Sequence, residues 1–437
     1  MKVLGASEAR SMLNNMVVSF VGLSMLLFQI IWTIKDIEKG TKLSIIFLLI
    51  GPNIFGISYE LISVFCLLIC WLLFDRQRRL INTPLGFYEK CAMLIVCSNI
   101  VMTMIYSNTY QITFNLIGIL GVIRVFVAIY IYKIYFAKDG FEKLKEILIW
   151  VVMINAIVVI IQMTIPSTVN LFYKLYWKSS LTPLDTMVKL GYFSRAFGTY
   201  GTPLYLSLIV LLSFIFFFYL WLTEKKWGKW AVLCAISMIC CFLSYSKTSY
   251  FGLVIIIVVE YILVLSKKRG CDITIKTGLL FLCFVVIITT LLAQAKDNLK
   301  LQYYLKFFKD PLSVFDTRYG DQGNLKELVE VFKSNWLFGV GISAIQGEFV
   351  GDSSYYVALH DGGVFLLAIY LILFGNMTIK AIRRKDIVCI TIMLIYFLIG
   401  FGTVIFTNFI GAIYIGFVLA RQNCKRRSMY EKNIALC

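Results

Sequence analysis

The chain has 437 residues, of which 60% are hydrophobic and only 15% are charged. A water-soluble fold cannot bury that much apolar surface, so this composition excludes an ordinary soluble domain. The net charge of +18 does not require a nucleic-acid partner. Most of the basic residues cluster in short loops between apolar runs, which is typical of the cytoplasmic loops of membrane proteins.

Apolar runs long enough to cross a hydrocarbon core about 30 Å thick recur along the whole chain. They are continuously apolar and do not alternate, which predicts helices and not barrel strands. We therefore expect an all-α integral membrane protein, a single multi-pass domain over 1–437 that forms a polytopic bundle of about twelve transmembrane helices. The expected spans are 16–34, 43–74, 91–107, 112–135, 147–165, 202–222, 230–246, 250–266, 277–294, 354–375, 387–404 and 405–420.

Basic loops are held in the cytoplasm, and this rule sets the expected orientation. The basic clusters fall at 76–79, 138–145, 225–229, 267–269, 383–385 and 425–427, which places both termini in the cytoplasm. The run at 43–74 is too long for one straight helix and contains Gly51 and Pro52, so we expect a kink or an interfacial half-helix there. The twelve cysteines show neither a disulfide framework nor zinc-ligand spacing, and no metal or cofactor is expected.

Two segments break the short-loop pattern, 166–201 and 295–353, and both are expected outside the cytoplasm. Binding and catalytic residues concentrate on such long loops. Within the second loop, apolar residues at helical spacing predict an amphipathic helix at 324–336, anchored by Trp336. We expect this helix to lie on the outer membrane surface and to cover a cavity between the spans.

The first candidate constellation is the segment 195–203, Arg-Ala-Phe-Gly-Thr-Tyr-Gly-Thr-Pro. Its glycines would let backbone N–H groups approach a ligand, and Arg195 offers a fork of donors suited to phosphate or diphosphate oxygens. Tyr200 is a candidate substrate contact in the same segment. The structural alternative is a glycine-rich loop whose arginine reaches the lipid headgroups.

Two further cations are candidates for substrate binding. Lys247 lies in the polar turn 244–249 at the expected outer face, where it would pair with the same diphosphate or simply form a solvated hairpin tip. Arg124 lies inside the fourth span, where an unpaired arginine costs roughly 2.5 to 3.5 kcal/mol, so it must face the bundle interior or water. Pairing with carbonyls or with Glu60 is the structural alternative to a substrate contact.

The third constellation surrounds the predicted amphipathic helix. His360 is the only histidine, and near the outer end of a span a neutral imidazole can act as a base. A histidine hydrogen-bonded within the bundle is the competing interpretation. Two nearby glycines are too few for a dinucleotide fingerprint. The polar residues and glycines of this constellation are Asp316, Arg318, Tyr319, Gly339, Gly341, Asp352, Ser353, His360 and Asp361.

In this order and on these loops, the three constellations resemble the O-antigen polymerase and ligase superfamily of membrane glycosyltransferases, the Wzy and WaaL group. Lys247 stands where the family usually has arginine, and Trp336 stands where proline is common. Ligases of the group usually carry His-Asn where this chain has Asp352 and Ser353, which favours a polymerase. The likeness covers the C-terminal half of the chain, at Arg195, Phe197, Gly198, Pro203, Ser246, Lys247, Arg318, Gly339, Gly341, Asp352, Ser353 and Tyr355.

The resemblance implies a polysaccharide polymerase of the bacterial plasma membrane, active in O-antigen (lipopolysaccharide) or capsule biosynthesis. It would transfer a growing glycan from one polyprenyl (undecaprenyl) diphosphate carrier onto an incoming lipid-linked repeat unit outside the cytoplasm. Its partners would be these lipid-linked oligosaccharides, the bilayer, a chain-length regulator and a flippase.

The implied site needs cations for the leaving diphosphate and a base for the acceptor hydroxyl. Arg195 and Arg318 are the first choices for the cations, followed by Lys247 and Arg124, with Tyr200, Tyr319 and Asp316 as further contacts. The base would be His360, Asp352, Asp316 or Asp361. Two alternatives stay open: a ligase of the same superfamily, and a flippase or other transporter, although related halves and interrupted helices typical of transporters are not evident.

Overall fold

The computed structural model describes residues 2–52, 54, 59–107, 116–176, 195–200, 202–224, 227–244, 246–267, 278, 333, 335–342 and 353–434. Regular secondary structure in these ranges consists mainly of α-helices. They are α1 (Lys2–Lys35), α2 (Ile37–Ile50), α3 (Tyr59–Phe74), α4 (Arg79–Asn82), α5 (Phe87–Ser107), α6 (Leu116–Tyr135), α7 (Gly140–Thr164), α8 (Pro166–Tyr176), α10 (Pro203–Thr223), α11 (Trp227–Leu243), α12 (Lys247–Lys267), α17 (Ser354–Arg383), α18 (Ile387–Gly400) and α19 (Phe409–Ile434).

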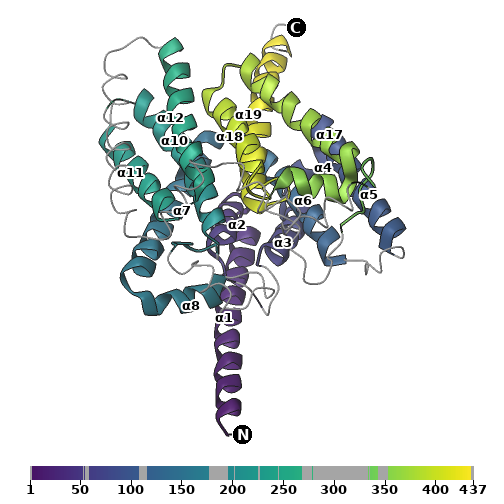
Figure 1. Cartoon of the computed structure of the whole chain (residues 1–437). Coiled ribbons are helices and arrows are strands. Elements are labelled where there is room, and N and C mark those ends of the chain that lie inside the picture. Colours follow the sequence, from purple (N-terminus) through teal and green to yellow (C-terminus); the bar gives the residue numbers. More distant parts are fainter. Residues whose placement is uncertain are drawn as a thin grey trace.

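Seven of the described helices are long and apolar enough to cross a membrane, namely α1, α5, α6, α7, α10, α12 and α17. The shorter apolar helices α3, α11, α18 and α19 pack among them (Figure 1). Helix α10 is apolar and buried on nearly every side, which makes it a central element of the bundle. The chain is therefore a multi-pass, all-helical membrane protein in the part that the structure describes.

The long apolar run at 43–74 forms the end of α2 and the whole of α3. Helix α2 stops at Gly51, whose N–H still donates to the Phe47 carbonyl, and Pro52 follows with no N–H to continue the helix. The two helices then run antiparallel, because their contacts pair positions in opposite order: Thr41 with Trp71, Ser44 with Ser63, and Gly51 with Tyr59. Where the sequence predicts a kink or an interfacial half-helix before the span, the structure has a 14-residue helix, α2, that forms a helical hairpin with α3.

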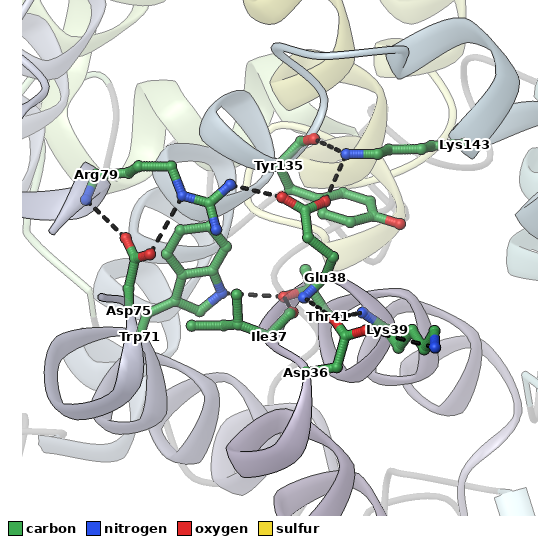
Figure 2. Close-up of polar contacts among 10 residues, drawn as sticks. All are labelled: Asp36, Ile37, Glu38, Lys39, Thr41, Trp71, Asp75, Arg79, Tyr135 and Lys143. Carbon is green, nitrogen blue, oxygen red and sulfur yellow. Dashed lines mark hydrogen bonds and ion pairs between the residues drawn. The ribbon is translucent and has the colours of Figure 1, made fainter. Parts of the chain in front are cut away.

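An ion-pair network ties this hairpin to its neighbours (Figure 2). The two carboxylate oxygens of Glu38 lie 2.5 Å from Arg79 Nη1 and 2.5 Å from Lys143 Nζ. Burial lowers the pKa of the Arg79 guanidinium, but the hydrogen bond and charge of Glu38, aided by Asp75, outweigh it and raise that pKa above its usual value. The α1–α2 turn consequently lies at the same end of the bundle as the basic turns 75–79 and 138–143.

This placement changes the expected orientation of the N terminus. Helix α1 ends beside the basic turns, so its N-terminal residues extend from the opposite end of the bundle, and the two chain termini lie at opposite ends of the molecule (Figure 1). The two termini thus lie at opposite ends of the described helices (Figure 1), whereas the sequence predicts both in the cytoplasm; the side of the membrane on which each lies stays a prediction. The physical reason is the α2–α3 hairpin, which brings the C-terminal end of α1 to the same end of the bundle as the basic turns 75–79 and 138–143.

At the end of the bundle away from the basic turns, α7 gives way to α8, which runs across its end (Figure 1). The expected loop 166–201 thus begins with a helix. Burial raises the pKa of the Tyr176 phenol on this helix above its usual value. The expected span at 277–294 and the predicted amphipathic helix at 324–336 lie outside the described residues, apart from single positions.

Candidate functional site

The segment 195–200 is held against α7 by two buried amide side chains. Gln162 Oε1 accepts the backbone N–H groups of Phe197 at 3.2 Å and Gly198 at 3.1 Å, and Asn155 Oδ1 accepts that of Thr199 at 3.0 Å. Gly198 has a φ of +58°, and a Cβ there would lie 2.3 Å from Asn155 Oδ1. The expectation that these N–H groups approach a ligand is therefore wrong, because the protein itself already uses them.

The segment 195–200, held in this way, positions Arg195. The backbone N–H of Ala196 donates to the carbonyl of Leu243, the last residue of α11, at 2.9 Å. Arg195, which is half-buried, thereby lies beside the polar turn that leads into α12 at Lys247. The structure brings the first and second constellations together at the end of the bundle away from the basic turns, whereas the side chain of Lys247 lies outside the described residues.

The beginning of α17 joins the same end of the bundle. The Ser354 hydroxyl donates to Thr403 O at 2.9 Å and accepts the N–H of Ile405 at 2.7 Å, which ties α17 to the connection 401–408 between α18 and α19. That connection also meets the first turn of α12, since a Cβ on Gly402 would lie 2.9 Å from Thr248 Oγ1. Three segments distant in sequence thus surround one region.

Helix α17 is interrupted directly after Asp361, one of the four candidate bases. Gly362 and Gly363 have non-helical backbone angles, and Gly363 has a φ of +62°. The segment 335–342 fills the break: Val340 N–H donates to His360 O at 2.8 Å and Gly341 N–H donates to Asp361 O at 3.0 Å. An interrupted helix was not predicted from the sequence.

His360 is buried within the bundle, where its ring Nδ1 lies 2.9 Å from Asp361 Oδ1. The two interpretations of His360, a catalytic base and a histidine hydrogen-bonded within the bundle, therefore both concern an imidazole that is paired with the adjacent carboxylate. Gly339 and Gly341, in the segment that contacts this part of α17, allow close packing of the backbone. A Cβ on Gly339 would lie 2.4 Å from His360 O, and one on Gly341 would lie 2.3 Å from Thr103 N.

Arg124 pairs with Glu60 inside the bundle, with Nη2 and Oε2 3.5 Å apart. The ion pair with Glu60, which was the structural alternative for this arginine, is thus present, and a substrate contact of Arg124 stays a prediction. Tyr200 is buried near the same carboxylate, and burial together with the Tyr414 phenol raises the pKa of Tyr200 well above its usual value. Arg124, Glu60 and Tyr200 form a polar interior beneath the segment 195–200.

Four predicted site residues, Asp316, Arg318, Tyr319 and Asp352, lie outside the described residues. Sequence reasoning missed Asn99, Glu89, Lys133 and Glu260, all of which are buried polar side chains in helices. A single carboxyl in the apolar run 250–266 was a readable signal for Glu260. Among the described residues, no three His, Cys, Asp or Glu side chains gather as metal ligands would.

No protein-family model matches the chain, and no curated protein matches its sequence. A functional proposal for this chain therefore rests on how its residues are arranged in the structure.

Proposed function

We propose that the chain is a membrane glycosyltransferase that joins polyprenyl-diphosphate-linked oligosaccharide repeat units outside the cytoplasm, as a polymerase of the O-antigen or capsule type. The observation that carries this proposal is the hydrogen bond from Ala196 to Leu243, which places Arg195 beside the turn at Lys247. The backbone segments that carry Arg195 and Lys247 then lie together at the end of the bundle opposite the basic loops. A diphosphate leaving group needs such preorganised positive charge.

In this proposal the full chain spans a bacterial plasma membrane with about twelve transmembrane helices. Arg195 and Arg318 contact the diphosphate of the donor lipid, and Lys247 adds charge nearby. Arg124 has a different part, because its pairing with Glu60 gives it a role in packing the interior below the site. The base for the acceptor hydroxyl comes from the polar groups at the start of α17.

Replacement of Arg195 tests the proposal directly. In a strain whose own copy is deleted, Arg195→Ala at unchanged membrane abundance should reduce the glycan from a ladder of lengths to single repeat units. Arg195→Lys should also be poor, because lysine cannot make a bidentate contact with phosphate oxygens. Arg383→Ala, an exposed arginine at the other end of α17, is the matched control and should leave the ladder intact.

The deletion strain itself separates the alternatives. Lipid capped with one repeat unit indicates a polymerase, uncapped core lipid indicates a ligase, and inward-facing lipid intermediates indicate a flippase. A normal ladder in the Arg195→Ala variant would remove that residue from the mechanism. A normal ladder in the deletion strain would remove the proposed function as a whole.

A further inference from the structure

Glu260 is an ionisable residue inside a membrane-spanning helix. It belongs to α12, within the apolar stretch Thr248–Ser266, and its side chain is completely buried. Neither of its carboxyl oxygens has a hydrogen-bond partner among the residues that the structure describes. Buried polar atoms without partners are rare in folded proteins, and each one requires an explanation. An ionisable residue in this position indicates a functional site.

The groups around Glu260 provide no compensating charge. Helix α12 packs on α10, α11 and α18. The ionisable side chains that interact with the carboxyl from these helices are Tyr219 of α10 and Cys234 of α11, and both types are ordinarily neutral at pH 7. Helix α18 contributes the hydroxyl of Thr391, which donates its own proton to the Ile387 carbonyl at 3.0 Å. No lysine, arginine or histidine in the described ranges forms an ion pair with Glu260.

An ionised carboxylate in these surroundings would be very costly. An unpaired charge in a low-dielectric interior takes up a proton instead of remaining charged. A protonated carboxyl also gains a donor, which the hydroxyl oxygen of Thr391 can accept. Ser237 lies one turn from Cys234 on the same face of α11, and its buried hydroxyl has no partner in the described part of the chain. These helices therefore offer acceptors for a proton held by Glu260.

A proton is the ligand that fits this place, because it needs no cavity. Any larger ligand would need space beside a side chain that has none of its surface exposed. A metal ion would need several ligands, and no three His, Cys, Asp or Glu side chains gather among the described residues. The chemistry and the burial of Glu260 thus both select a proton.

Glu260 lies in the part of α12 nearer to the basic turns. It stands seven residues before Lys267, the last residue of α12, which is about 10 Å at a rise of 1.5 Å per residue. Lys247, the first residue of α12, is about 20 Å away by the same measure. The α11–α12 hairpin places the end of α12 beside the start of α11, where Lys145 Nζ lies 5.8 Å from the centroid of the Trp230 ring.

Tyr219 links Glu260 to a polar pair at that end of the bundle. Its phenol interacts electrostatically with Glu260, with Asp386 and with Arg421. Arg421 Nη2 lies 2.7 Å from Asp386 Oδ2, and the arginine side chain is 41% exposed. Asp386 directly follows the basic residues 383–385. Polar groups therefore lead from the solvent at the basic end toward the buried carboxyl.

We infer that Glu260 is a proton-binding site in the interior of the bundle, and that it exchanges its proton with the basic end by way of Tyr219 and the Asp386–Arg421 pair. On release, the proton passes from the Glu260 carboxyl to the Asp386 carboxylate, with the Tyr219 phenol between them. The carboxylate left behind is buried and unpaired, so release requires α10, α11 and α18 to admit water. Proton binding thus couples to movement among these helices. The inference does not rest on the proposed function.

Infrared spectroscopy of the purified full chain tests the site. A protonated carboxyl has a C=O stretching band that an ionised carboxylate lacks, and dodecyl maltoside, a detergent without carbonyl groups, leaves this region clear. The spectrum of the unmodified protein minus that of Glu260→Gln should contain this band at pH 8, where an exposed glutamate with its usual pKa of about 4.3 is ionised. Glutamine has the shape of the protonated acid, so this variant should remain monodisperse. Glu146→Gln, at an exposed and ion-paired carboxyl, is the matched control and should retain the band.

Deuterium exchange tests the route. In heavy water the band shifts as a deuteron replaces the proton, and the rate of this shift measures proton exchange at Glu260. Tyr219→Phe should slow the shift severalfold, and so should Asp386→Asn. Asparagine still caps α18, so the second variant removes the titratable group without removing the cap. Tyr205→Phe, at the opposite end of α10, is the matched control and should leave the rate unchanged.

Each outcome decides one part of the inference. A difference spectrum without the protonated band at pH 8 would show an ionised Glu260 and overturn the site. Glu260→Asp is a second variant that keeps an acid on a shorter side chain, so it should shift the band; an unshifted band would assign it to another carboxyl. Equal exchange rates in Tyr219→Phe, Asp386→Asn and the unmodified protein would overturn the route.

Discussion

The buried ion pair between α5 and α6 gives the sharpest stability prediction. Lys133 Nζ lies 2.6 Å from Glu89 Oε1, and the two side chains are only 10% and 6% exposed. Glu89→Gln keeps an oxygen that can accept the N–H of Gly86 but removes the charge that compensates the ammonium. Breaking a buried pair by removing one partner costs about 3 to 5 kcal/mol. In this variant Lys133 Nζ still lies 5.6 Å from the centroid of the Tyr130 ring, a cation–π contact that compensates part of its charge. We therefore expect a cost in the lower part of that range, about 3 kcal/mol.

The pair between Lys42 and Glu146 is the matched control. Its N–O distance is 2.5 Å, yet the side chains are 32% and 56% exposed, so Glu146→Gln should cost no more than about 1 kcal/mol. The free energy of unfolding, measured by titration with sodium dodecyl sulfate in mixed micelles, checks both values. The double variant Glu89→Gln with Lys133→Met should recover part of the loss. Equal costs for the two single variants would refute the argument that burial, and not distance, determines the magnitude.

Gly341→Ala should destabilise the protein by more than 1 kcal/mol, because its φ is +81° and the new Cβ meets backbone; Gly121→Ala, in a helix with open space around it, should be neutral or stabilise by up to about 1 kcal/mol in the same titration. A cysteine at Ser7 should react with a membrane-impermeant maleimide on intact cells, and one at Asp139 should not; the reverse would contradict the orientation of α1. Tyr200 keeps its proton in the folded state above the usual tyrosine pKa of about 10, so its contribution to stability is present below that pH and is lost as pH rises. Tyr200→Phe should therefore weaken the alkaline fall in unfolding free energy, and an unchanged slope would count against burial of the phenol.

Most of the helices could be predicted from the sequence, because a continuous apolar run has few options in lipid. The pairing of Arg124 was within reach for the same reason: an arginine inside a span needs a partner, and Glu60 was the carboxylate available to it. These features depend on local composition and on the high cost of leaving a charge or a backbone group unpaired. Neither requires knowledge of how distant segments pack.

The candidate site was harder to predict, because its backbone N–H groups can bind either a ligand or another part of the protein. The glycines near Arg195 and at 339–341 suggested close approach of backbone to something, and in the structure that something is the protein. Gln162 and Asn155 take the N–H groups of 197–199, and the start of α17 takes those of 340 and 341. A glycine pattern shows that backbone comes close but does not show to what. Asn99 gave no comparable signal, whereas the glycine pair 362–363 inside an apolar run was a readable signal for the break in α17.

The orientation of the N terminus shows how a single boundary error propagates. A run of 32 residues, 43–74, exceeds the roughly 20 residues of one span and falls short of the length of two spans with a connection. The structure resolves this by starting the first helix earlier, at Ile37, inside the polar stretch that follows Lys35. Asp36 caps that start by accepting the N–H groups of Glu38 and Lys39.

The same stretch carries the charges that settle which end of α1 lies with the basic turns. Lys35 ends α1 and Lys39 and Lys42 follow it, whereas only Lys2 and Arg10 offer positive charge before its apolar part. The rule that basic segments stay in the cytoplasm therefore favours the C-terminal end of α1 on that side. The ion pairs of Glu38 support the same arrangement. Glu38 can bind Arg79 and Lys143 together only if the α1–α2 turn and the turns 75–79 and 138–143 lie at one end of the bundle. The two termini then lie at opposite ends of the described helices (Figure 1), and Arg195, in the segment that precedes α10, lies at the end away from the basic turns.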